Sequence, residues 1–235
     1  MTEPRLTYEE PKHLTASIYA KGPEPRKLLF HFKRVATRSG SKLDVVREYS
    51  YPDGSIAAKE HVVYQANQLA LFESNLLQTG ETGKALITNN HTIHDLGSIE
   101  FEYMQNASSK AKFRREPLRE DTLIGDMIGP FLTSHWGQLV NGEKVKCRYL
   151  VVPRRETVEF MFSKNAESTW QGRGVLILKM EPASRIIAAL VEPLFFTIEK
   201  SSPHHVLEYV GRTTPKIQVN GKWKDLDAVS VFDWK

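Results

Sequence analysis

The sequence predicts a mainly β fold of the α+β class, in which a large curled antiparallel sheet, or half-barrel, surrounds one central helix. Three observations support this. Apolar and polar residues alternate over most of the chain, turn-forming residues separate the alternating runs, and one central segment has helical spacing instead. We expect a single domain over residues 1–235, in which β meanders at about 13–116 and 144–234 flank a helix at about 122–140.

The first meander is predicted by strand-like runs that meet at a tight turn. Apolar residues repeatedly alternate with polar ones on both sides of the turn, which is typical of strands with one buried face. In Pro52-Asp53-Gly54-Ser55, the proline presets its own φ and the glycine accepts a positive φ, so the chain can reverse. The alternating residues are Leu43, Val45, Tyr49 and Tyr51, followed by Ile56, Ala58, Val62 and Tyr64.

The helix is predicted by apolar residues three and four positions apart, which lie on one face of a helix. Gly129-Pro130 interrupts the segment, and proline is tolerated in a first turn, so we expect a short turn followed by a main helix from Pro130. A second short helix is expected from Ser184 to Val191. The apolar face consists of Ile124, Met127, Ile128, Phe131, Leu132, Trp136 and Leu139.

The second meander is predicted by further alternating runs after the helix. The clearest local signal is Asn220-Gly221, the favoured composition for a two-residue hairpin turn. The expected strands are Lys144–Val152, Thr157–Ser163, Gly174–Met180, Leu194–Lys200 and His205–Gly211.

Composition excludes several classes of function. The formal charge of +4, from 32 Lys and Arg against 28 Asp and Glu, is spread along the chain, so nucleic-acid binding is not indicated. The single cysteine, Cys147, rules out an intrachain disulfide, and we interpret it as a small buried side chain on a strand. No apolar run is long enough to predict a transmembrane segment.

One loop contains side chains that could bind a metal ion. His91, His94 and Asp95 are close in sequence and are residue types that ligate zinc, which would suit a metal-assisted hydrolase. A solvated turn between strands explains the same residues, and we favour it because a loop does not fix ligand geometry. We therefore expect no metal or other cofactor, and we favour a function without catalysis.

A second candidate surface is basic. Lys144, Lys146 and Arg148 share one face of a predicted strand and could meet anionic headgroups, a nucleic-acid backbone or an acidic partner. An ordinary solvated sheet surface is the alternative, and we favour it because no aromatic residues suited to base stacking are interleaved there.

The large apolar residues allow two interpretations. They could fill a core between the sheet and the helix, or the sheet could curl around a cavity that holds an apolar ligand. For the second case, the candidate lining residues are Met127, Phe131, Trp136, Phe160 and Phe162.

The order of elements resembles uncharacterised exported bacterial β proteins with a curled sheet similar to that of lipoprotein carriers. The resemblance implies the fold and an envelope location. The segments that carry it are Tyr51–Ser55, the helix through His135-Trp136, Met180–Ser184, Val191–Leu194 and Leu207–Arg212.

Our leading hypothesis is a non-enzymatic, envelope-associated protein that binds a lipid, an acyl chain or a protein partner within the sheet. We expect a monomer. We expect it in the periplasm if a signal peptide has been removed and in the cytoplasm otherwise.

Overall fold

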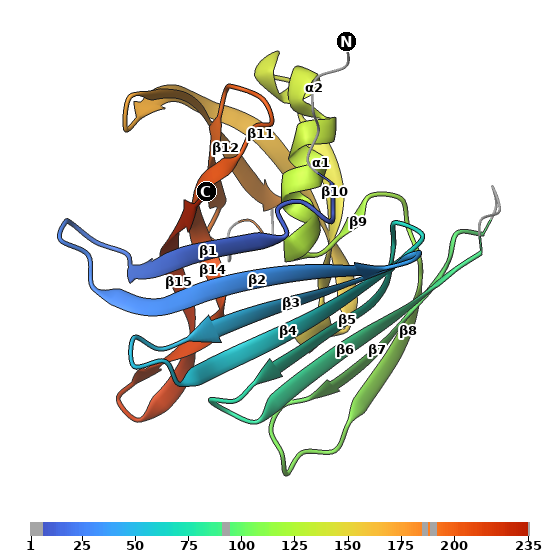
Figure 1. The fold of residues 1–235 in the computed structure, drawn as a ribbon. Helices are drawn as coiled ribbons and strands as arrows, with labels where there is room; N and C mark the ends of the chain where they lie inside the picture. Colours follow the sequence, from blue (N-terminus) through green and yellow to red (C-terminus); the bar gives the residue numbers. More distant parts are fainter. Residues whose placement is uncertain (1–6, 91–94, 185–187, 189–191, 235) are drawn as a thin grey trace.

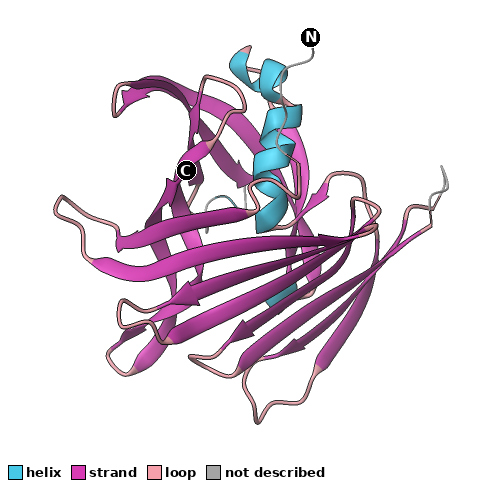
Figure 2. Ribbon diagram, in the orientation of Figure 1, coloured by secondary structure: helices cyan, strands magenta, loops and turns pink. Residues whose placement is uncertain are grey.

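The protein is described by a computed structural model that covers residues 7–90, 95–184, 188 and 192–234. These residues form one open sheet of fifteen strands, in the order β8-β7-β6-β5-β4-β3-β2-β1-β15-β14-β13-β12-β11-β10-β9. The sheet curls around a short helical segment (Figure 1), and strands dominate the whole molecule (Figure 2). The predicted fold class, a mainly β protein with a curled open sheet, is confirmed.

The first meander runs from one end of the sheet to its middle, and each strand pairs antiparallel with the next. Its strands are β1 (His13–Ala20), β2 (Leu28–Ser39), β3 (Lys42–Ser50), β4 (Ile56–Gln65), β5 (Gln68–Leu76), β6 (Glu81–Asn89), β7 (Gly97–Met104) and β8 (Lys112–Pro117).

The second meander completes the sheet. β1 pairs antiparallel with β15, which joins the two meanders, and the short β9 adds a parallel pair with β10 at the far edge. The sheet is therefore mixed, although nearly all of its pairs are antiparallel. The strands are β9 (Thr122–Leu123), β10 (Val145–Val151), β11 (Glu156–Trp170), β12 (Arg173–Pro182), β13 (Leu194–Glu199), β14 (Val206–Val219) and β15 (Lys222–Asp233), with a 3-10 turn η2 (Val152–Arg154) after β10.

The predicted hairpin turns are present. The amide of Tyr51 donates to the carbonyl of Ser55 at 2.8 Å, and Gly54 has a φ of +88°. Asn220 and Gly221 both have positive φ values, as a two-residue hairpin of this composition requires.

Two strands are longer than the alternation predicts. β11 continues past Ser163 to Trp170, and β14 continues past Gly211 to Val219. Each strand contains a register shift, between Lys164 and Ala166 in β11 and between Arg212 and Lys216 in β14. In β11 the shift is one extra residue, which reverses the inward and outward alternation, so the pattern stops while the strand goes on.

The central helix expected at about 122–140 is shorter and broken. Thr122–Leu123 form β9, and the helical residues are η1 (Gly125–Met127), α1 (Ile128–Ser134) and α2 (Trp136–Val140). The break falls at His135, whose backbone is not helical, with a φ of −106° and a ψ of 14°. The carbonyl of Phe131 accepts hydrogen bonds there from the Ser134 hydroxyl at 2.7 Å and from the His135 amide at 3.2 Å. The expected second helix, Ser184–Val191, lies mostly outside the described residues.

The largest core cluster lies between the helical segment and the inner face of the sheet. It includes fully buried side chains from both meanders, such as Leu43, Tyr64, Phe101 and Phe162. The first meander also contacts the second through β8 and β11. Glu116 of β8 accepts a hydrogen bond from the amide of Thr157 on β11, at 2.9 Å. The described residues contain no helix that is long and apolar enough to cross a membrane.

Candidate functional site

Charged side chains form a row across three neighbouring strands on the inner face of the sheet. Arg34 on β2 is opposite Arg47 on β3, and Arg47 is opposite Glu60 on β4. Each occupies a position where the alternation would otherwise place an apolar residue, because Phe32 and Tyr49, two positions away, are buried on the same face. The strand register therefore carries three charges into the interior.

A fourth charge comes from the helical segment. Asp126 in η1 accepts hydrogen bonds from Nε and Nη2 of Arg34, at 2.7 and 3.2 Å, and from the hydroxyl of Tyr64 at 2.8 Å. The Asp126 side chain is 1% exposed and that of Arg34 is 6% exposed. Arg34 also donates to the carbonyl oxygens of Tyr8 and Pro11. This cluster therefore ties the helical segment, the sheet and the N-terminal segment together.

Arg47 lies between two carboxylates. Its Nη1 is 2.6 Å from Oε2 of Glu60, its Nε is 3.9 Å from Oδ1 of Asp126, and its guanidinium lies 5.3 Å from the ring centre of Phe32. Burial disfavours the charge on Arg47, but attraction to the carboxylates of Glu60 and Asp126 opposes this effect, and the pKa of Arg47 is raised. Arg47 is therefore a fixed cation.

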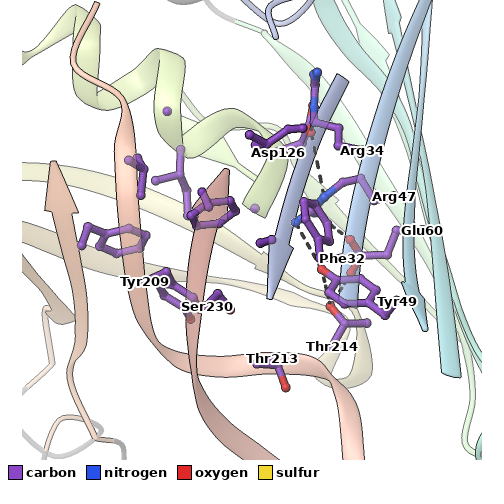
Figure 3. Close-up of a pocket in the computed structure, with 18 of the residues that line it drawn as sticks. Phe32, Arg34, Arg47, Tyr49, Glu60, Asp126, Tyr209, Thr213, Thr214 and Ser230 are labelled. Atoms are coloured by element: carbon purple, nitrogen blue, oxygen red, sulfur yellow. Dashed lines mark hydrogen bonds and ion pairs between the residues drawn. The ribbon is translucent and has the colours of Figure 1, made fainter. Parts of the chain in front are cut away.

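Two hydroxyl groups complete the polar side of the site. Thr214, on β14, donates to Oε1 of Glu60 at 2.6 Å and lies 3.3 Å from the hydroxyl of Tyr49. Arg47 Nη2 also donates to the hydroxyl of Tyr49 at 3.3 Å. Burial, opposed by Arg47, raises the pKa of Tyr49, so its phenol is neutral at physiological pH. Figure 3 shows these groups on one side of a pocket.

These groups line a cavity of about 190 Å³ inside the curl of the sheet. Both meanders and the helical segment contribute to it, and burial raises the pKa of Tyr149, on its wall, to about 12. Exposed Glu10 and Arg212 also line it, so it opens to solvent on that side. The apolar wall includes Leu14, Ala16, Ile18, Phe32, Phe72, Ile128, Phe196 and Val206.

Gly125 provides room for the polar side of the cavity. A Cβ at this position would lie 3.1 Å from Nη1 of Arg47 and 3.3 Å from the hydroxyl of Tyr149, which is closer than most such contacts. The absence of a side chain therefore lets Arg47 and Tyr149 approach the helical segment.

Most of the ligand-lining residues predicted from sequence lie behind the apolar wall of the cavity. Met127, Phe131 and Phe162 are buried in the core, and Phe162 lies 5.8 Å from Phe131 and 5.7 Å from Phe196, between ring centres. Phe196 is itself part of the cavity wall.

The other two predicted residues are half-buried. Phe160 packs edge-on against Tyr149, with ring centres 6.2 Å apart, so it supports a residue of the wall. Trp136 is stacked on His204, with ring centres 3.9 Å apart. Phe160 and Phe162 thus pack directly against residues of the cavity wall, and Phe131 packs against Phe162.

The predicted basic surface is partly neutralised. Lys144 is exposed just before β10, and Lys146 and Arg148 on β10 both lie near Glu159 on β11, at 3.2 and 3.4 Å. Binding of anionic surfaces by these residues stays a prediction.

The predicted metal ligands are described only in part. His91 and His94 lie outside the described residues. The carboxylate of Asp95 accepts hydrogen bonds from the side chain of Asn90 at 2.7 Å and from the amide of Gly97 at 2.9 Å. Within the described ranges, no group of three or more His, Cys, Asp or Glu side chains could hold a metal ion.

Cys147 is buried on β10, and burial raises the pKa of its thiol to about 12. This agrees with its interpretation as a small core residue.

Comparisons of this chain with protein-family models, with curated proteins and with solved structures gave no match. The resemblance to lipoprotein carriers stays a prediction. Any functional conclusion therefore depends on the chemistry of the cavity.

Proposed function

We propose that the protein binds a small amphipathic molecule in the cavity enclosed by its curled sheet. The observation that supports this is the division of the cavity into an apolar wall and a compact polar side around Arg47. Binding sites for small molecules commonly combine such a wall with a few placed polar groups.

The size of the cavity limits the ligand. A cavity of about 150 Å³ is enough to hold benzene, so about 190 Å³ suits a single ring or a short acyl chain. A long acyl chain would have to extend past Glu10 and Arg212 into solvent. The ligand class is therefore a short apolar body with one polar head.

The polar side fixes the orientation of such a ligand. Arg47, Tyr49 and Thr214 offer hydrogen-bonding groups on one side, while Phe196 and Val206 offer apolar contacts. A polar head placed against the apolar wall would lose its hydrogen bonds with water, so the head faces Arg47. An envelope location and a protein partner are separate predictions on which this proposal does not depend.

Isothermal titration calorimetry with a panel of six-carbon probes tests the proposal: hexanamide, 1-hexanol, hexanoate and hexylamine. At least one probe should bind the wild-type protein saturably. Ser230, on β15, lines the cavity and is 5% exposed, so Ser230→Leu should fill the space and abolish binding. Ser230→Ala is the matched control and should retain binding.

Circular dichroism and thermal unfolding establish that the filled variant is folded. Should Ser230→Leu fail to fold, Ala16→Leu on β1 fills the same cavity from a neighbouring strand. Failure of all four probes to bind the wild-type protein, or undiminished binding by the filled variant, would contradict the proposal.

A further inference from the structure

The charges that line the cavity cancel. Three of its lining residues are cationic, Arg34, Arg47 and Arg212, and three are anionic, Glu10, Glu60 and Asp126. The four interior charges are arranged as close pairs, with Arg34 2.7 Å from Asp126 and Arg47 2.6 Å from Glu60. The interior is therefore polar without a net charge.

A charged ligand would disturb this balance. A carboxylate beside Arg47 would also face Glu60, whose Oε2 is buried and has no well-aligned hydrogen bond to any described residue. An ammonium group would face Arg34 and Arg47 in the same way. In both cases a new charge would lose its hydration beside interior charges that are already paired with each other.

An uncharged polar head meets neither penalty. The guanidinium of Arg47 can donate a hydrogen bond to a ligand oxygen, because its side chain keeps 14% exposure and its Nη2 makes only a long contact, 3.3 Å, with Tyr49. The hydroxyl oxygens of Tyr49 and Tyr149, on the same side of the cavity, can accept a hydrogen bond from the ligand.

We propose that the cavity selects ligands whose polar head is uncharged and carries a hydrogen-bond donor next to an acceptor, such as a primary carboxamide or an alcohol. This proposal rests on the proposed function, because it names the class of ligand that the same cavity takes. The pairing of Arg47 with Glu60 is the specificity determinant.

The four six-carbon probes test the proposal at pH 7.5, where hexanoate is anionic and hexylamine is cationic. Hexanamide and 1-hexanol should bind the wild-type protein about tenfold or more tightly than the charged probes, because burial of an uncompensated charge is costly. This ranking requires no variant.

Two substitutions change the net charge of the cavity while keeping a side chain that can form hydrogen bonds. Glu60→Gln leaves a net positive charge and should raise the affinity for hexanoate relative to hexanamide by about tenfold. Arg47→Gln leaves a net negative charge and should favour hexylamine instead. Glu73→Gln is the control, because Glu73 lies on β5 away from the cavity lining and is 40% exposed; it should leave the ranking unchanged.

The outcomes separate the two proposals. Binding of none of the probes would overturn the proposed function itself. Saturable binding in which hexanoate or hexylamine is the tightest ligand of the wild-type protein would overturn the charge-neutral selection and leave cavity binding in place. An unchanged ranking in folded Glu60→Gln would show that Glu60 does not determine specificity.

Discussion

Replacing Asp126 by alanine should destabilise the protein more than replacing any exposed carboxylate. Asp126 accepts three hydrogen bonds, two from Arg34 and one from Tyr64, and its side chain is 1% exposed. Alanine removes all three acceptors. It also leaves the Arg34 guanidinium, 6% exposed, without its carboxylate partner.

The magnitude follows from this geometry. Removal of one partner of a buried ion pair costs about 3–5 kcal/mol, because the remaining charge stays desolvated. Asp126→Ala should therefore lower the free energy of unfolding by about 3–5 kcal/mol. For a protein of this size, each kcal/mol of lost stability lowers the melting temperature by about 2–4 °C.

Urea unfolding followed by tryptophan fluorescence measures this change. Asp44→Ala is the matched control, because Asp44 pairs with Lys42 and His61 at distances of 2.9 and 3.0 Å but is 32% exposed; the expected cost is below about 1 kcal/mol. The double variant Arg34→Met/Asp126→Leu should recover much of the loss, since it leaves no unpaired charge. A loss below about 1 kcal/mol for Asp126→Ala would refute the assignment of Asp126 as the anchor of the helical segment.

Three further predictions concern the same interior. Gly125→Ala places a Cβ 3.1 Å from Nη1 of Arg47, so it should weaken probe binding in calorimetry; an unchanged affinity would argue against contact between Arg47 and the ligand. Cys147 should react with a thiol reagent far more slowly in the native protein than in urea, because burial raises its pKa to about 12, and rapid native labelling would contradict this. Burial also raises the pKa of Tyr149 from 10.0 to about 12, so between these values the folded state holds a proton that the unfolded state has lost. Stability should therefore fall as the pH rises from about 10 towards 12, and equal urea midpoints at pH 9 and pH 11 would refute this.

Much of the fold could be predicted because the alternation of apolar residues reports directly on which face of a strand is buried. The turns at Gly54 and Gly221 were also predictable, since their composition favours the backbone angles observed. The helical segment was predicted in place but not in length. The spacing of apolar residues does not show the non-helical backbone of His135, where the helix breaks.

The residues predicted from the sequence do not include the polar side of the site, although the sequence contains a signal for it. In the alternating runs Leu43, Val45, Tyr49 and Ala58, Val62, Tyr64, the positions omitted are 47 and 60, where Arg47 and Glu60 point inward. A charge at an inward position of a strand indicates a buried polar site.

The rest of the site could not be predicted because it depends on the curl of the whole sheet. Thr214 meets Glu60 across 154 residues of sequence, and Asp126 reaches Arg34 across 92. Alternation within a strand fixes the face of each residue but not the curvature that brings distant strands together. For the same reason, spacing places Phe131 and Phe162 in the interior, where both are buried, but does not show whether they line the cavity or lie behind its wall.

The crystal structure of the protein with hexanamide tests the central claim most directly. We expect the probe inside the cavity, with its carbonyl oxygen within hydrogen-bond distance of Arg47 and its alkyl chain against Phe196 and Val206. A cavity that contains only water, at a hexanamide concentration that saturates binding in calorimetry, would contradict the claim.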